Sequence, residues 1–251
     1  MDGLRQSRLE TLRTQIAALE KRPMLAEGAA VLRRRGGAGV LATAPGLVHE
    51  VFTDEMRNAG AALGFALGQA RAFLTPERPA VFYLQLAHEG QERGVPYGAG
   101  LAAFGFAPEN LAIVRVKAMP ELLWAMEEAL GCRAVAGVVA DIGGHPKILD
   151  FTASRRLSLR AASGGASVFL MRYGVEREAS AAQLRWRIDP APSGTVRFDP
   201  RAPGEARWRV TLEKGVAGAN AAPGGNWLVS WEDGFDVAQN ERRPIRHRLA
   251  G

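Results

Sequence analysis

Short apolar runs alternate with amphipathic stretches over the middle of the chain. The runs at residues 47–52, 80–86, 111–116, 134–140 and 167–173 are almost continuously apolar, which is typical of strands covered on both faces. The amphipathic stretches between them predict helices over residues 59–73, 97–104, 120–130 and 152–162. Strands separated by helices require crossover connections and therefore a mainly parallel sheet. The pattern predicts a three-layer α/β domain.

The pattern changes to a period of two after Gly174. Apolar and charged residues alternate over residues 183–188, 207–213 and 227–231, with Trp186 and Trp208 each flanked by two arginines. This alternation predicts strands with one solvated face. Prolines and glycines between the three segments supply turns, so we expect an antiparallel extension of the sheet.

The N-terminal segment predicts an amphipathic helix between residues 4 and 22. Its apolar face consists of Leu9, Leu12, Ile16 and Leu19. A helix this short needs tertiary packing to persist, so this face is expected to dock either on its own domain or on a neighbouring chain. The chain therefore divides into a docking helix with a basic linker (1–40), a core (41–239) and a basic tail (240–251).

Composition and charge exclude several classes of protein. Hydrophobic residues make up 47% of the 251 residues and charged residues 23%, as in ordinary globular domains. No apolar run is long enough to cross a bilayer, so no membrane association is expected. A single cysteine, Cys132, cannot form an internal disulfide, which favours the reducing cytoplasm. We therefore expect a cytoplasmic globular protein.

The net charge of +6 resides in the C-terminal part of the chain. Residues 1–150 carry 16 cationic and 16 anionic side chains, whereas residues 151–251 carry 16 and 10. A further candidate contact surface is the tail, through Arg242, Arg243, Ile245, Arg246 and Arg248. Most cationic residues of this Ala- and Gly-rich chain are arginines, so the abundance of arginine is weak support for phosphate binding. We therefore expect at most a weak contact with DNA.

Candidate catalytic chemistry is sparse at the ends of the predicted strands, where an α/β sheet binds ligands. Residues 53–60 stand where a phosphate-binding loop is expected, but they contain no lysine, and Asp54 and Glu55 would repel a triphosphate. Asp141 ends an apolar strand and is expected to be structural. The four histidines and Cys132 show no metal-ligand spacing. We predict no catalytic residue, cofactor or metal.

Three segments resemble those of a known family. They are residues 122–130 with the strand that follows to Asp141, residues 149–157, and residues 207–214 with 225–229. Their order is similar to that of the RecA-like recombinase core and, more closely, of the ImuA family of SOS-mutagenesis accessory proteins, which is often grouped with the cell-division inhibitor SulA. The resemblance covers most of residues 45–232.

The resemblance implies a RecA-like fold without an ATPase. Asp141 matches the carboxylate that helps to hold Mg²⁺ in recombinases, but the Walker A lysine is absent, residues 84–87 lack the catalytic glutamate, and Met171 and Arg172 replace the nucleotide-sensing glutamine. The two DNA-binding loops of a recombinase would fall at residues 142–149 and 174–182, and both are short. The sequence therefore predicts a pseudo-ATPase rather than an enzyme.

The family role implied is that of a non-catalytic adaptor in translesion DNA synthesis. ImuA proteins work with ImuB, a polymerase relative without catalytic residues, so an ImuB-like protein is the expected partner, with RecA or DNA as further candidates. Two alternatives stay open: a SulA-like inhibitor that binds FtsZ, and a RecA-like NTPase with a divergent nucleotide site. The sequence does not define the oligomeric state.

Overall fold

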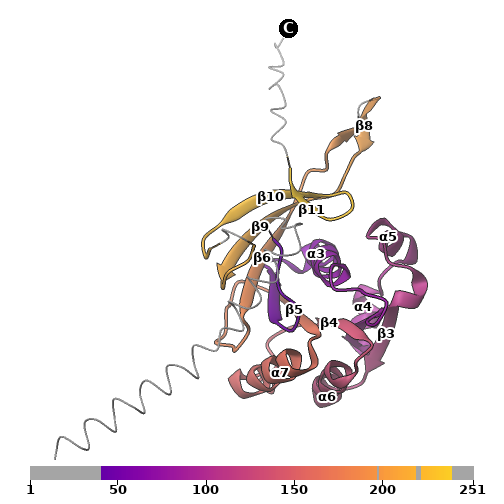
Figure 1. The fold of residues 1–251 in the computed structure, drawn as a ribbon. Helices are drawn as coiled ribbons and strands as arrows, with labels where there is room; N and C mark the ends of the chain where they lie inside the picture. The colour runs from indigo at the N-terminus through magenta and orange to yellow at the C-terminus, as the bar shows by residue number, and fades with distance from the viewer. Residues whose placement is uncertain (1–40, 197, 219–221, 239–251) are drawn as a thin grey trace, which may run out of the picture.

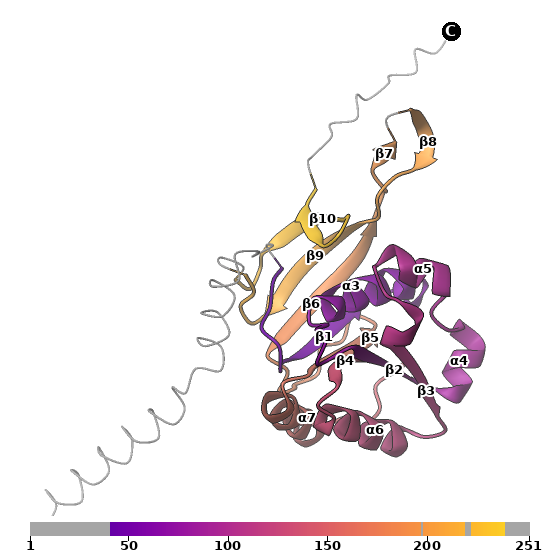
Figure 2. The same cartoon turned by 45° about the vertical axis from the view of Figure 1, so that its right-hand side comes forward.

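The computed structural model describes residues 41–196, 198–218 and 222–238, which form an α/β fold around one large sheet (Figures 1 and 2). Its strands are β1 (Val48–Thr53), β2 (Ala80–Leu86), β3 (Leu111–Val116), β4 (Val135–Asp141), β5 (Ser167–Tyr173), β6 (Leu184–Ala191), β9 (Arg207–Lys214), β10 (Asn226–Trp231) and β11 (Phe235–Val237). A separate two-stranded ribbon consists of β7 (Thr195–Val196) and β8 (Asp199–Pro203). The helices are α3 (Ala59–Arg71), α4 (Ala87–Arg93), α5 (Gly98–Ala103), α6 (Met119–Gly131) and α7 (Phe151–Gly164), with short 3-10 turns η1 (Met56–Asn58) and η2 (Pro108–Asn110).

The sheet has the strand order β11-β10-β9-β6-β1-β5-β4-β2-β3. The strands from β6 to β3 in this order run parallel, and β9, β10 and β11 are antiparallel to their neighbours. The predicted mainly parallel α/β fold with a C-terminal antiparallel extension is confirmed, and it is consistent with a RecA-like core. One detail of the prediction was wrong. The strand expected at residues 183–188 pairs in parallel with β1, so the antiparallel part begins one strand later.

Helices cover the two faces of the sheet with two separate apolar cores. Helix α3 packs on one face with β6, β9 and β10, whereas α6 and α7 pack together on the other (Figure 2). Helix α3 fits its face because it is rich in Ala and Gly: a Cβ at Gly68 would lie 2.7 Å from the ring of Phe235 and 2.8 Å from that of Trp231. Because Gly68 has no side chain, these rings fit against α3, and this contact fixes the antiparallel strands to the parallel core.

Tryptophan side chains complete this packing with hydrogen bonds. The indole N–H of Trp208 donates to the Ala61 carbonyl and that of Trp231 donates to the Ala103 carbonyl, both at 3.0 Å. Trp186 donates to Nδ1 of His49 at 3.3 Å within the core. The alternation around Trp186 and Trp208 therefore places the indoles inside and the arginines on the other face, as predicted.

The described helices contain none that is long and apolar enough to cross a membrane. The predicted docking helix and basic tail lie outside the described residues. Their contact residues Leu9, Leu12, Ile16, Leu19, Arg242, Arg243, Ile245, Arg246 and Arg248 are therefore sequence predictions only.

The buried His49 predicts a pH-dependent stability. Burial lowers the pKa of His49 to about 3, so the folded protein keeps this ring neutral. The unfolded chain takes up a proton below its ordinary pKa of about 6.5, so stability is intact above that pH and falls as the pH drops towards 3. The expected loss between about pH 7.5 and about pH 5 is roughly 2 kcal/mol. Urea unfolding of His49→Gln should lack this part of the loss; equal losses in both proteins would contradict it.

Candidate functional site

The carboxyl ends of the parallel strands are the place where an open α/β sheet presents a ligand site. The connection after β1 passes through Asp54, Glu55 and the turn η1 before α3 begins at Ala59. Asp54 is engaged by Arg177, whose Nη2 donates to Asp54 Oδ1 at 2.9 Å. This connection contains no lysine, and its first acidic side chain is held by an arginine of a neighbouring connection. The described residues thus provide no phosphate cradle here.

Asp141 lies at the end of β4, buried beside the side chains of four donors. The hydroxyl of Tyr173 donates to Asp141 Oδ1 at 2.6 Å and that of Tyr83 donates to Oδ2 at 2.9 Å. Arg93 Nη2 donates to Oδ1 at 3.2 Å, and Gln85 Nε2 reaches Oδ2 at 3.4 Å. Each carboxylate oxygen therefore accepts two hydrogen bonds.

The electrostatics of this group keep the donors protonated. Burial and the charge of Asp141 raise the pKa of Tyr83 and of Tyr173 well above the ordinary tyrosine value. Burial alone would lower the pKa of Arg93, but the charges of Asp141 and Glu89 raise it overall. Two neutral hydroxyls and a guanidinium thus face the carboxylate, which has no oxygen lone pair left for an additional metal ion.

Glu89 joins the same group from helix α4. Arg93 Nη2 lies 2.7 Å from Glu89 Oε2, and the backbone N–H of Gly143 donates to Glu89 Oε1 at 3.0 Å. Arg93 therefore bridges the carboxylates of Glu89 and Asp141, and Glu89 fixes the start of the connection after β4. No group of three or more His, Cys, Asp or Glu side chains is placed to hold a metal ion in the described part of the chain.

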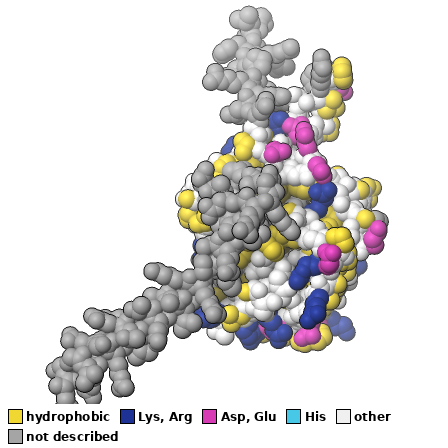
Figure 3. Space-filling model, viewed as in Figure 1, with side chains coloured by type: hydrophobic (Ala, Val, Ile, Leu, Met, Phe, Trp, Pro, Cys, Tyr) yellow, Lys and Arg dark blue, Asp and Glu magenta, His cyan; other side chains and the backbone are white. Residues whose placement is uncertain are grey.

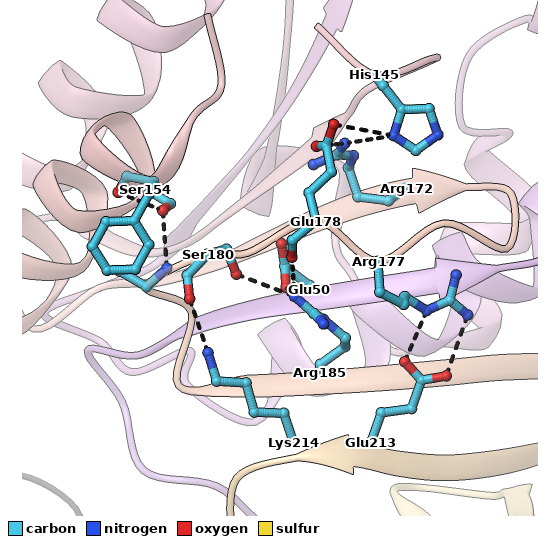
Figure 4. A network of polar contacts seen from close by, with 12 residues as sticks. Glu50, His145, Ser154, Arg172, Arg177, Glu178, Ser180, Arg185, Glu213 and Lys214 are labelled. Atoms are coloured by element: carbon cyan, nitrogen blue, oxygen red, sulfur yellow. Dashed lines mark hydrogen bonds and ion pairs between the residues drawn. The ribbon is translucent and has the colours of Figure 1, made fainter. Parts of the chain in front are cut away.

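A second polar network anchors the connection between β5 and β6 to the sheet (Figure 4). Glu178 accepts from Arg172 at 3.0 Å and lies 3.7 Å from His145 of the connection after β4. Arg185 donates to the Glu178 carbonyl at 2.7 Å and forms an ion pair with the buried Glu50. The connection after β4 and the connection between β5 and β6 are therefore linked to each other.

The connection between β5 and β6 is also held by contacts with the strands and the helix around it. Lys214 Nζ donates to the Ser180 carbonyl at 2.9 Å, and the Ala181 N–H donates to Ser154 Oγ at 2.9 Å. Arg177 donates to Glu213 from Nε at 2.8 Å, and its guanidinium carbon lies 4.1 Å from the centre of the Phe52 ring. Burial opposes its charge, but hydrogen bonds to Glu213 and Asp54 raise the pKa of Arg177. The charged side chains of the connection between β5 and β6 are thus largely paired within the protein.

The sequence indicated Asp141 but not its partners. The sequence signal for the partners is a polar residue within an apolar strand, because a buried polar side chain needs a hydrogen-bond partner. Such residues are Tyr83, Gln85 and Tyr173. Glu89 and Arg93 are spaced four residues apart on α4, a helix that the apolar pattern did not predict. Each carboxylate oxygen of Asp141 accepts two hydrogen bonds, which agrees with the structural role expected of this residue.

The mainly parallel sheet flanked by helices, with its antiparallel C-terminal strands, is consistent with a RecA-like core. No family model matches the chain. Protein ImuA from two strains of Caulobacter vibrioides is 37% identical over 147 residues, which cover 55% of this chain and 57% of each relative. The match thus spans little more than half the length of these curated relatives. It supports the assignment of the chain to the ImuA family.

The Asp141 group predicts a strong effect on stability. Asp141→Ala would leave two buried hydroxyls without their acceptor and Arg93 with Glu89 as its one remaining carboxylate, which should cost about 3 kcal/mol or more. Tyr83→Phe removes one donor and should cost about 1 kcal/mol. Urea unfolding checks both, with the exposed Asp236→Ala as the matched control, expected within about 0.5 kcal/mol of the unaltered chain. An equally small change for Asp141→Ala would contradict the network.

Proposed function

We propose that the protein is a non-catalytic adaptor of SOS-induced translesion DNA synthesis that binds an ImuB-like partner in the cytoplasm. The observation that carries the proposal is the saturation of Asp141 by four donors. A carboxylate that positions Mg²⁺ on a nucleotide must leave at least one oxygen open to the metal. The absence of lysine from the connection after β1 supports the same conclusion.

The ion pairs of Arg172 and Arg177, at the end of β5 and in the connection after it, support a protein partner over DNA. Arg172 and Arg177 are paired with carboxylates, and a paired guanidinium must break an ion pair before it can contact a phosphate. We therefore propose that the basic residues Arg242, Arg243, Arg246 and Arg248, with Ile245, contact a protein. RecA is a second candidate partner in the same role.

The first test is nucleotide hydrolysis by the purified chain. With magnesium and ATP, in the presence or absence of single-stranded DNA, phosphate release should equal that of buffer alone. A fluorescent ATP analogue should show no saturable binding. DNA-stimulated turnover that Asp141→Asn abolishes would assign the protein to the NTPases and refute the proposal.

The second test concerns the predicted N-terminal docking helix. Burial of one leucine contributes about 2 kcal/mol, so Leu12→Asp with Ile16→Asp should weaken binding of the ImuB-like partner by tens-fold or more. Surface plasmon resonance against the purified partner measures it. Thr14→Asp with Lys21→Asp, on the opposite side of the predicted helix, is the control and should bind normally. If the first pair instead unfolds the isolated chain, the helix packs on its own domain.

A further inference from the structure

Exposed apolar side chains gather on the connections that follow the parallel strands. Of the twelve large hydrophobic residues that are exposed in the described part of the chain, six belong to this edge of the sheet. They are Met56 after β1, Val95 and Tyr97 after β2, Ile148 and Phe151 after β4, and Val175 after β5. We call these six residues the apolar rim.

The connections that carry the apolar rim are neighbours because their four strands are neighbours. The sheet order places β1, β5, β4 and β2 side by side, so their carboxyl ends form one row. Met56 Sδ, in the connection after β1, lies 3.8 Å from Arg93, in the connection after β2. This contact links the connections at the two ends of the row. Tyr97 is 78% exposed and Val175 is 73% exposed. Large apolar side chains clustered at this exposure indicate an interaction site.

The charge of the same connections identifies the chemistry of the occupant. Residues 54–58, 87–97, 142–151 and 174–183 together carry seven carboxylates and four Lys or Arg side chains, a net charge of −3 in a chain of +6. Arg57, Arg93 and Arg177 are in ion pairs, whereas the exposed Lys147 has no ion-pair partner among the described residues. The exposed Glu92 and Glu176 have no ion-pair partner among the described residues. Figure 3 shows hydrophobic, acidic and basic side chains next to one another on the side where α4 and α5 lie.

We infer that this acidic edge with its apolar rim is a docking surface for the protein partner, in addition to the predicted N-terminal helix face and tail, and that the partner presents to it a segment of apolar side chains together with Lys or Arg. The inference rests on the proposed adaptor function and adds to it the surface used and the chemistry that it recognises. A nucleotide or nucleic acid is disfavoured because its phosphates would meet a net negative edge. An apolar segment alone would leave the carboxylates of Glu92 and Glu176 without counter-charges.

The apolar rim is tested by removing its two most exposed members without adding charge. Tyr97→Ser with Val175→Ser should weaken binding of the purified ImuB-like partner at least ~30-fold, because an exposed aromatic anchor of an interface commonly carries that much affinity. The matched control is Trp124→Ser with Leu159→Ser, two apolar residues on α6 and α7 that are 66% and 61% exposed. It should bind as the unaltered chain does. Thermal unfolding should be the same for all three proteins.

The charge of the edge is tested separately. Glu92→Lys with Glu176→Lys should slow association about tenfold and remove most of its salt dependence, because long-range attraction acts chiefly on the association rate. If the unaltered chain binds the partner and neither pair of edge substitutions changes binding, the docking surface lies elsewhere and this inference is overturned while the adaptor function stands.

Two other results would also overturn it. Absence of any binding by the unaltered chain would remove the adaptor function and the inference together. If sedimentation of the chain alone shows a dimer that Tyr97→Ser with Val175→Ser dissociates, the occupant of the edge is a second copy rather than a partner of another kind.

Discussion

The buried carboxylate of Asp141 is the constraint on which the carboxyl edge of the sheet depends. A charge at the end of an interior strand is tolerated only if donors surround it. Here the donors come from β2, β5 and α4. One charge on β4 therefore fixes the positions of the strands on both sides of it and of one helix. Glu89 extends the restraint to the chain after β4 through the Gly143 N–H.

Many polar groups at this edge are paired within the protein. Arg93 pairs with Glu89 and Asp141, and the connection between β5 and β6 is held against the sheet by Glu178, Arg177 and Lys214. The side chains that remain exposed there include the six residues of the apolar rim, Glu92 and Glu176, and also basic residues such as Lys147. Connections already held by contacts within the protein lose less conformational entropy when a partner docks, which favours binding to a preformed surface.

Much of the fold follows from local pattern, whereas the site does not. The runs at residues 80–86, 111–116 and 167–173 define β2, β3 and β5 to the residue. Strand β5 is buried throughout and β2 mostly so, as a nearly continuous apolar run predicts, whereas β3 lies at the edge of the sheet and is only partly buried. The alternation around Trp186 shows which side of β6 is buried but not the direction of its neighbour, which depends on pairing with β1. Helix α4 is short and mostly polar, so it carries no apolar period. The contacts of Asp141 join residues 83, 141 and 173, and no local pattern relates positions so far apart.

Hydrogen exchange of the full chain, alone and with the ImuB-like partner, tests the central claim most directly. The account predicts that the partner slows exchange in residues 87–97 and 174–178, at the carboxyl edge, and that magnesium with ATP changes nothing there. Protection of these residues by ATP without the partner would contradict it, because the edge would then still be a nucleotide site.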